Sequence, residues 1–156
     1  MISINIPGFK PLELSHLVSD YNGTLALDGV LLPGVADALK ALSLHLHIHV
    51  ITADTFGLAK YQLEGLPLDL HITPVESQAQ TKLDFVNSLG AESVVALGNG
   101  RNDRLMLQAA ALGIALIQRE GAAAQTLGSA DLVCTSVQDA LALLTTPKRL
   151  TATLRS

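Results

Sequence analysis

Short apolar runs recur along the chain, and polar residues follow each of them. Six of these runs have the length and composition of buried strands: residues 12–20, 45–54, 68–74, 93–100, 112–118 and 131–135. Between them, residues 34–44, 81–89, 104–111 and 137–144 carry apolar side chains at helical spacing. Strands that alternate with helices predict right-handed crossovers and a parallel sheet. We therefore expect a three-layer, Rossmann-like α/β fold.

Three polar clusters, SDYNGT (19–24), TADT (52–55) and GNGRND (98–103), fall where predicted strands end. Because the carboxyl ends of parallel strands meet at one edge of a sheet, where ligand sites of such folds lie, we expect the clusters to be neighbours. Residues 25–32, LALDGVLL, place Asp-Gly between two apolar runs. This pattern predicts a short hairpin that forms a flap over the site.

The composition limits the class of protein. The 156 residues are expected to form one domain, 1–156, whose core is aliphatic because aromatic residues make up only 3%. Charged residues are also few, at 15%, which favours coverage of apolar surface in a homo-oligomer. A net charge of −4 with scattered basic residues argues against nucleic-acid binding. We found no membrane span or secretion signal in the sequence and a single cysteine, Cys134, so we expect a cytoplasmic protein with no membrane partner.

The polar clusters, taken in order, resemble the four motifs of the haloacid dehalogenase (HAD) superfamily. The motif positions are Asp20 to Thr24, Thr52 at a strand end, Lys82 near the start of a helix, and Gly98 to Asp103. The sequence is most similar to the phosphorylation domain of P-type ATPases and its small soluble relatives, whose motifs read DKTGTLT, TGDN and GDGxND. The resemblance covers residues 12–144. Since residues 53–81 are too few for an inserted cap domain, it implies a capless HAD-like hydrolase.

This resemblance implies a Mg²⁺-dependent phosphohydrolase that forms an aspartyl phosphate on Asp20. Its substrate would be a phosphorylated small molecule or macromolecule. The implied catalytic residues are Asp20, Asn22, Thr52 and Lys82. The implied metal ligands or their neighbours are Asp20, Asn22 through its backbone carbonyl, Asn99 and Asp103. The implied phosphate-binding residues are Thr52, Ala53, Lys82 and Asn102.

Each motif residue also has a structural interpretation. Asp20 could be a turn residue before Asn-Gly, Thr52 an ordinary strand residue, and Lys82 a solvated helix lysine like Lys60. For Asp54 we prefer a helix N-cap of the segment TFGLAK to a catalytic role. Asn102 and Asp103 could cap the helix that follows them.

Two residues depart from the superfamily pattern. Asn22 stands where phosphatases of the superfamily usually have a second aspartate, and an amide cannot donate a proton to a leaving group. Asn99 stands where a metal-binding aspartate is usual, which predicts weaker Mg²⁺ binding. We therefore expect slow hydrolysis. The alternative is a domain that has lost hydrolysis and serves as a binding or regulatory subunit.

A separate feature is the alternation of His45, His47 and His49 along one predicted strand. Alternating residues point to one face of a strand, and three imidazoles on one face can bind zinc or nickel. The strand end that carries them lies away from the motif edge, so partly exposed histidines without a ligand are the preferred interpretation. His16 and His71 add nothing specific to this pattern.

Overall fold

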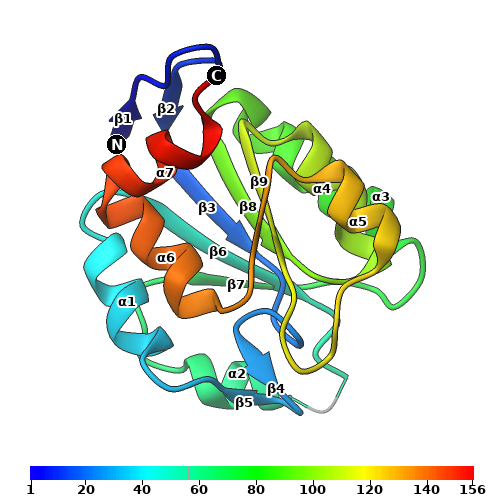
Figure 1. The fold of residues 1–156 in the computed structure, drawn as a ribbon. Helices are drawn as coiled ribbons and strands as arrows, with labels where there is room; N and C mark the ends of the chain where they lie inside the picture. Colours follow the sequence, from blue (N-terminus) through cyan, green and yellow to red (C-terminus); the bar gives the residue numbers. More distant parts are fainter. Residues whose placement is uncertain (56) are drawn as a thin grey trace.

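The chain folds around one parallel six-stranded sheet with helices on both faces (Figure 1). The computed structural model describes residues 1–55 and 57–156. The strand order in the sheet is β10-β9-β8-β3-β6-β7, and every neighbouring pair is parallel. This architecture confirms the expected three-layer, Rossmann-like α/β fold.

The strands of the large sheet end close to where the sequence predicts. Their bounds are β3 His16–Ser19, β6 His47–Thr52, β7 Asp69–Ile72, β8 Val94–Gly98, β9 Leu112–Leu116 and β10 Leu132–Cys134. One predicted strand is wrong in part, because the run 12–20 breaks at Ser15. Its first half is β2 (Leu12–Leu14), which pairs with β1 (Ile2–Ile4) in a small antiparallel sheet. The sequence pattern did not predict β1.

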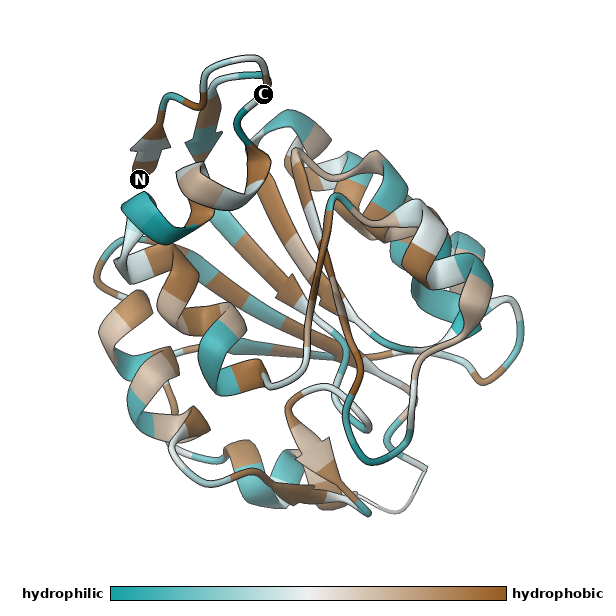
Figure 2. Ribbon diagram, in the orientation of Figure 1, coloured by the Kyte–Doolittle hydropathy of each residue, from teal (hydrophilic) through white to brown (hydrophobic). Residues whose placement is uncertain are grey.

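Helices cover both faces of the sheet. On one face lie α1 (Val35–Leu42), α6 (Val137–Thr145) and α7 (Pro147–Leu154); on the other lie α3 (Gln78–Leu89), α4 (Arg104–Ala109) and α5 (Ala124–Ser129). Figure 2 shows the strands between them as largely hydrophobic. Both faces of the central strands are buried, as in β8, where all five residues are inaccessible. Parallel strands covered on both faces require such continuous apolar runs.

The predicted hairpin is present over residues 26–31. Its strands are β4 (Ala26–Leu27) and β5 (Val30–Leu31), and both turn residues, Asp28 and Gly29, have positive φ, at 51° and 83°. Asp-Gly favours the tight turn that such angles define. Helix α2 (Leu58–Leu63) supports the hairpin, because the Gln62 side-chain oxygen accepts a hydrogen bond from the Leu31 N–H at 3.1 Å.

Two smaller elements complete the chain. The 3₁₀-helices are η1 (Ala91–Ser93) and η2 (Arg101–Asp103). Over the described residues, no unit the size of a cap domain interrupts the fold between β6 and α3. None of the described helices combines the length and the apolar character needed to cross a bilayer.

Candidate active site

The strand order reverses at β3. After β3 the chain runs to β6 and β7 on one side, then crosses to β8, β9 and β10 on the other. Asp20 follows β3, Thr52 ends β6 and Gly98 ends β8, so the three polar clusters share one edge at this switch point, as predicted. The Asp20 N–H donates to the Leu97 carbonyl at 3.0 Å, which fixes the residue to the neighbouring strand.

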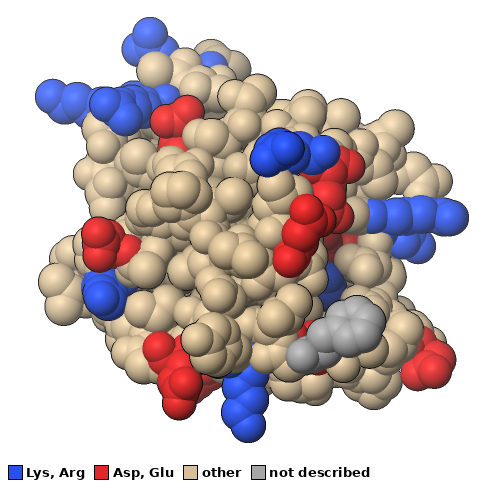
Figure 3. All heavy atoms as spheres, turned by 90° about the horizontal axis from the view of Figure 1, so that it is seen from below, with Lys and Arg blue, Asp and Glu red and all other residues tan. Residues whose placement is uncertain are grey.

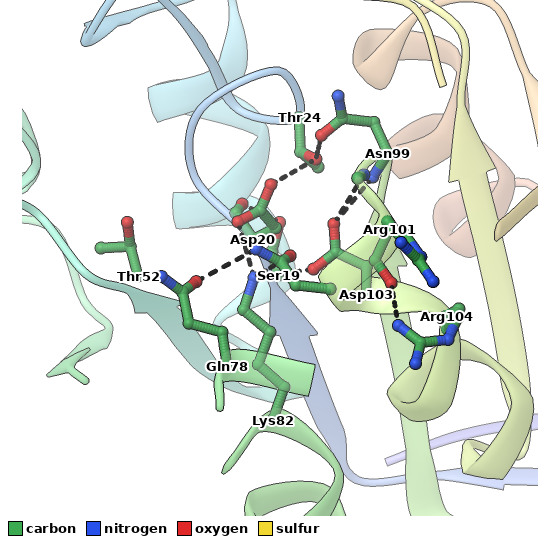
Figure 4. A network of polar contacts seen from close by, with 12 residues as sticks. Ser19, Asp20, Thr24, Thr52, Gln78, Lys82, Asn99, Arg101, Asp103 and Arg104 are labelled. Atoms are coloured by element: carbon green, nitrogen blue, oxygen red, sulfur yellow. Dashed lines mark hydrogen bonds and ion pairs between the residues drawn. The ribbon is translucent and has the colours of Figure 1, made fainter. Parts of the chain in front are cut away.

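Lys82 connects the motifs in the interior of the protein (Figure 4). Only 1% of Lys82 is exposed, and its ammonium donates to Asp20 Oδ1 at 3.0 Å, Asp103 Oδ1 at 2.7 Å and Asn102 Oδ1 at 3.1 Å. Burial alone lowers the pKa of Lys82, but the charges of Asp20 and Asp103 outweigh it and raise that pKa above its usual value. The ammonium is therefore a permanent buried cation, and the solvated-lysine interpretation is wrong.

Asp103 is buried completely and organises the loop before it. Its Oδ2 accepts hydrogen bonds from the N–H groups of Asn99 at 3.0 Å and Gly100 at 2.9 Å. Burial and the charge of Asp20 raise the pKa of the Asp103 carboxyl. The side chain thus caps the turn of η2 and makes no capping bond to α4. A side chain at Gly98 would overlap Asp103, so glycine is required there.

The Thr24 hydroxyl lies between a side-chain oxygen of Asp20 and the side-chain oxygen of Asn99. The Thr24 hydroxyl lies 3.3 Å from Asp20 Oδ2 and 3.2 Å from Asn99 Oδ1, and can donate to one of them at a time. Asn99 keeps its oxygen on this side because its Nδ2 donates to the Gly121 carbonyl at 3.1 Å. The sequence motifs did not identify the bridging role of Thr24, which depends on a contact between residues 75 positions apart.

These oxygens fit a hard divalent cation. Carboxylate, amide and carbonyl oxygens are the ligands that Mg²⁺ prefers, and the Asp20 carboxylate and the Asn99 amide oxygen lie on one side of the site. Asp103 differs, since Lys82 and two backbone N–H groups occupy both of its oxygens and the side chain is inaccessible. Its geometry suits the positioning of the loop and of Lys82 rather than direct contact with an ion.

A cavity of about 700 Å³ opens in front of Asp20. Figure 3 views this end of the molecule, where acidic side chains gather beside a hollow. The residues expected from the motifs that line the cavity are Asp20, Asn22, Thr52, Ala53, Asn99 and Asn102. Gln78 and Glu120 also line it and were not expected. Burial and the charges of Asp20 and Asp28 raise the pKa of the Glu120 carboxyl.

Asn22 and Asp54 hold backbone groups at the rim of the cavity. The Asn22 side-chain oxygen accepts a hydrogen bond from the Gly29 N–H at 2.9 Å and so ties the hairpin to the motif loop. The Asp54 carboxylate accepts from the N–H groups of Ala59 at 2.7 Å and Lys60 at 3.1 Å. Asp54 therefore binds N–H groups in the first turn of α2, but the N-cap residue is Gly57, so the prediction that Asp54 is the N-cap is wrong in position. Phe56 of the segment TFGLAK lies outside the described residues.

Comparisons with known proteins identify one relative by sequence. The chain is 42% identical over 83 residues to the uncharacterized protein MJ0073 of Methanocaldococcus jannaschii, a match that spans 51% of this chain and 89% of MJ0073. No protein-family model matches the chain.

Solved structures share the fold at low identity. A Legionella pneumophila protein assigned to subfamily III A of the HAD superfamily is 17% identical, with a TM-score of 0.71 over 90% of this chain and 86% of its own. The 3-deoxy-D-manno-octulosonate 8-phosphate phosphatase of Moraxella catarrhalis is 15% identical, with a TM-score of 0.73 over 92% and 94%. Part of a zinc-transporting PIB-type ATPase, 20% of its chain, matches 79% of this one with 22% identity and a TM-score of 0.62.

At these identities the structural matches establish a shared fold. The chain belongs to one family with MJ0073, and its fold is that of the haloacid dehalogenase superfamily.

Proposed function

We propose that this protein is a slow, Mg²⁺-dependent phosphohydrolase that works through an aspartyl phosphate on Asp20. The observation that carries the proposal is the buried Lys82 ammonium, which bonds both Asp20 and Asp103 beneath an open, polar cavity. A buried ammonium shared by two carboxylates contributes little net stability to a fold, because the cost of removing the charges from water offsets their attraction. It has a clear use where a phosphoryl group brings further negative charge to the same place.

The proposed nucleophile is Asp20. Its Oδ1 is held by Lys82, and its backbone is fixed to β8, so the carboxylate is rigidly mounted at the base of the cavity. In the reaction a carboxylate oxygen forms a bond to phosphorus while the bond from phosphorus to the leaving oxygen breaks. Water then attacks the aspartyl phosphate at phosphorus, which releases inorganic phosphate and restores the carboxylate.

In this proposal four groups hold the oxygens of the transferred phosphoryl group. They are the Thr52 hydroxyl, the Ala53 N–H, the Lys82 ammonium and the Asn102 amide, and three of these residues line the cavity. Asn102 is fixed on both sides, because its oxygen accepts from Lys82 and its Nδ2 donates to Gln78 Oε1 at 3.1 Å. Groups that are fixed in advance stabilise developing charge without reorganisation during the reaction.

A bound Mg²⁺ would neutralise phosphoryl charge and help to align the phosphorus with Asp20. The residues that would hold it are Asp20, Asn22 through its backbone carbonyl, and Asn99. Because Asn99 is neutral, the site carries one negative charge fewer than a site with aspartate there, and we expect weak Mg²⁺ binding. Asp103 would contribute to the metal site indirectly, because it fixes the loop that carries Asn99.

For substrates with poor leaving groups, departure of the leaving oxygen should limit the rate. The Asn22 amide donates no proton to a leaving oxygen, and its own oxygen is engaged by the Gly29 N–H. A positioned acid or base typically contributes about 10²- to 10⁴-fold. We therefore expect good leaving groups, such as those of acyl phosphates and p-nitrophenyl phosphate, to react faster than alkyl phosphates.

The direct test is a hydrolysis assay with acyl phosphates, sugar phosphates, a 3-deoxy-sugar-acid phosphate and p-nitrophenyl phosphate, with and without Mg²⁺. We expect Mg²⁺-dependent release of phosphate that Asp20→Asn abolishes. Asp37→Asn, the same change at an exposed helix position, is the matched control and should keep full activity. Equal activity of Asp20→Asn and the parent would refute the proposal. Complete inactivity of the parent on every compound would favour a binding or regulatory subunit.

A further inference from the structure

A second cluster of ionisable side chains lies under α3, on the sheet face away from α1. It comprises His16 of β3, His47 and His49 of β6, and Asp69 and His71 of β7. The strand register brings them together, since His16 pairs with His47 and His49 pairs with Asp69. His45, which the sequence pattern had grouped with His47 and His49, lies before β6 in a turn, so that part of the prediction is wrong.

His49 is the centre of this histidine cluster. Its side chain is almost inaccessible, with 4% of the residue exposed, and Phe85 of α3 packs edge-on against its ring at 5.3 Å. Both of its ring nitrogens face another imidazole. Nε2 lies 3.2 Å from Nδ1 of His16, and Nδ1 lies 3.2 Å from Nε2 of His71.

His47 completes a set of three imidazoles at the amino ends of β3 and β6. Its ring centroid lies 4.3 Å from that of His49 and 5.8 Å from that of His16. One ligand nitrogen from each of the three residues can be chosen so that all lie within 4.8 Å of one another. Asp69 Oδ2 lies 2.6 Å from His47 Nε2 and therefore orients this ring from the next strand.

These dimensions match the ligand set of a transition metal. Two nitrogens bound to one tetrahedral Zn²⁺ at 2.0–2.1 Å are roughly 3.3–3.4 Å apart, close to the 3.2 Å between His16 and His49. Metal-bound histidines commonly donate their second ring N–H to a carboxylate, which is the place that Asp69 occupies beside His47. We propose that His16, His47 and His49 bind one Zn²⁺-class ion, with Asp69 as the supporting carboxylate.

The site differs from the cavity at Asp20 in both place and chemistry. His16 and His47 are the first residues of β3 and β6, whereas Asp20 and Thr52 stand at the carboxyl ends of the same strands. Imidazole ligands suit Zn²⁺, Cu²⁺ or Ni²⁺, while the oxygens at Asp20 suit Mg²⁺. The proposed ion would tie β3 to β6 at the end of the sheet opposite the catalytic edge and stabilise the fold. This proposal does not depend on the proposed phosphatase activity.

The test is a titration of untagged protein with Zn²⁺ by calorimetry, in excess Mg²⁺ so that the oxygen site is not measured. Co²⁺ absorption spectra provide a second readout of nitrogen ligation. We expect one Zn²⁺ per chain with a dissociation constant of roughly micromolar or below. Loss of a residue that only supports a metal ligand typically weakens metal affinity by about 10- to 100-fold. We therefore expect Asp69→Asn to weaken Zn²⁺ binding by about 10-fold, and loss of a ligand in His49→Gln or His16→Asn to weaken it by at least about 100-fold.

Two histidines outside the proposed ligand set serve as controls. His45→Asn should bind Zn²⁺ as the parent does, whereas His71→Asn removes only the partner of His49 Nδ1 and should weaken binding by about 10-fold, as Asp69→Asn does. His16 is half-buried at the start of a strand, so His16→Asn gives a folded variant for the test even if His49→Gln does not fold. Zn²⁺ should also raise the melting temperature of the parent and leave that of His16→Asn unchanged. Equal Zn²⁺ affinity of His16→Asn and the parent, a loss of binding in His45→Asn, or a loss in His71→Asn as large as that in His16→Asn would overturn the proposal.

Discussion

The Lys82 ammonium lies 3.0 Å from the Asp20 carboxylate, although the two residues are 62 positions apart in the sequence. Helix α3 carries the lysine beneath the carboxyl end of β3, and the same ammonium reaches Asp103 at 2.7 Å. These two contacts of one ammonium join the first, third and fourth motifs. The Lys82 ammonium thus lies between one buried carboxylate, Asp103, and one partly buried carboxylate, Asp20, and it is the positive charge that compensates both.

Replacement of Lys82 by methionine should abolish hydrolysis and destabilise the protein. Without the cation, the fully buried Asp103 carboxylate would be left uncompensated beside the Asp20 carboxylate, and we expect the free energy of unfolding to fall by about 3 kcal/mol. Urea denaturation measures this change. Lys60→Met, at an exposed position of α2, is the matched control and should change stability by less than about 0.5 kcal/mol. A Lys82→Met variant as active as the parent would show that Lys82 has no role in hydrolysis.

Lys82 also marks a limit of prediction from sequence. The strand ends at Thr52 and Gly98 could be predicted because apolar runs stop there and polar clusters follow. A lysine on a helix, in contrast, gives the same local pattern whether it is exposed or buried. The histidine cluster was missed for a related reason. His16 and His71 lie on strands that contribute to the cluster only through the register of β3, β6 and β7, which no local pattern specifies.

The double change Asn22→Asp and Asn99→Asp should raise turnover by at least about 10²-fold. The first change supplies a proton donor and keeps the oxygen that accepts from the Gly29 N–H. The second adds a charge for Mg²⁺ but loses the amide donor to the Gly121 carbonyl, so the metal-free variant should be less stable than the parent. Steady-state rates over a range of Mg²⁺ concentrations, with urea denaturation, measure both effects.

Deamidation is the control for that experiment. Both asparagines precede glycine, so an aged preparation could acquire carboxylates, and intact-mass and peptide analysis must accompany the rates. If fresh, fully amidated protein already matches the double variant, another group supplies the proton and our explanation of slow turnover is wrong. Glu120 would then be the residue to replace, because it lines the same cavity and the pKa of its carboxyl is raised.

Gly113→Ala should destabilise the fold without any change at the active site. Gly113 lies in β9, and a methyl group there would overlap the Leu107 carbonyl of α4. Overpacking against backbone typically costs about 1–3 kcal/mol. Gly128→Ala in α5 is the control, because its methyl group would meet open space and alanine is favoured over glycine in a helix by about 1 kcal/mol. Opposite shifts of the two melting temperatures are expected, and equal stability of the two variants would contradict this account of the β9–α4 contact.

Acid should destabilise the metal-free protein through His49. The pKa of His49 is lowered from 6.5 to about 4, and burial is the largest cause. The charges of the neighbouring His47, His16 and His71 also lower it, and the charge of Asp69 opposes them. Between these values the unfolded chain binds a proton that the folded chain does not, so stability present above pH 6.5 is lost as the pH falls toward 4. The free energy of unfolding in a chelator should therefore decrease over this range, by roughly 3 kcal/mol at most from this residue. His49→Leu should flatten the decrease, and His45→Asn should retain it.

The central claim is that Asp20 accepts the phosphoryl group. The Asn22 amide does not activate water as a carboxylate would, so we expect the aspartyl phosphate to accumulate during turnover of an acyl phosphate. Borohydride reduces such an acyl phosphate to homoserine, and peptide mass spectrometry locates the converted residue. The account predicts homoserine at position 20 in the parent and none in Asp20→Asn. Turnover with no conversion at position 20, or with conversion at another carboxylate, would contradict it.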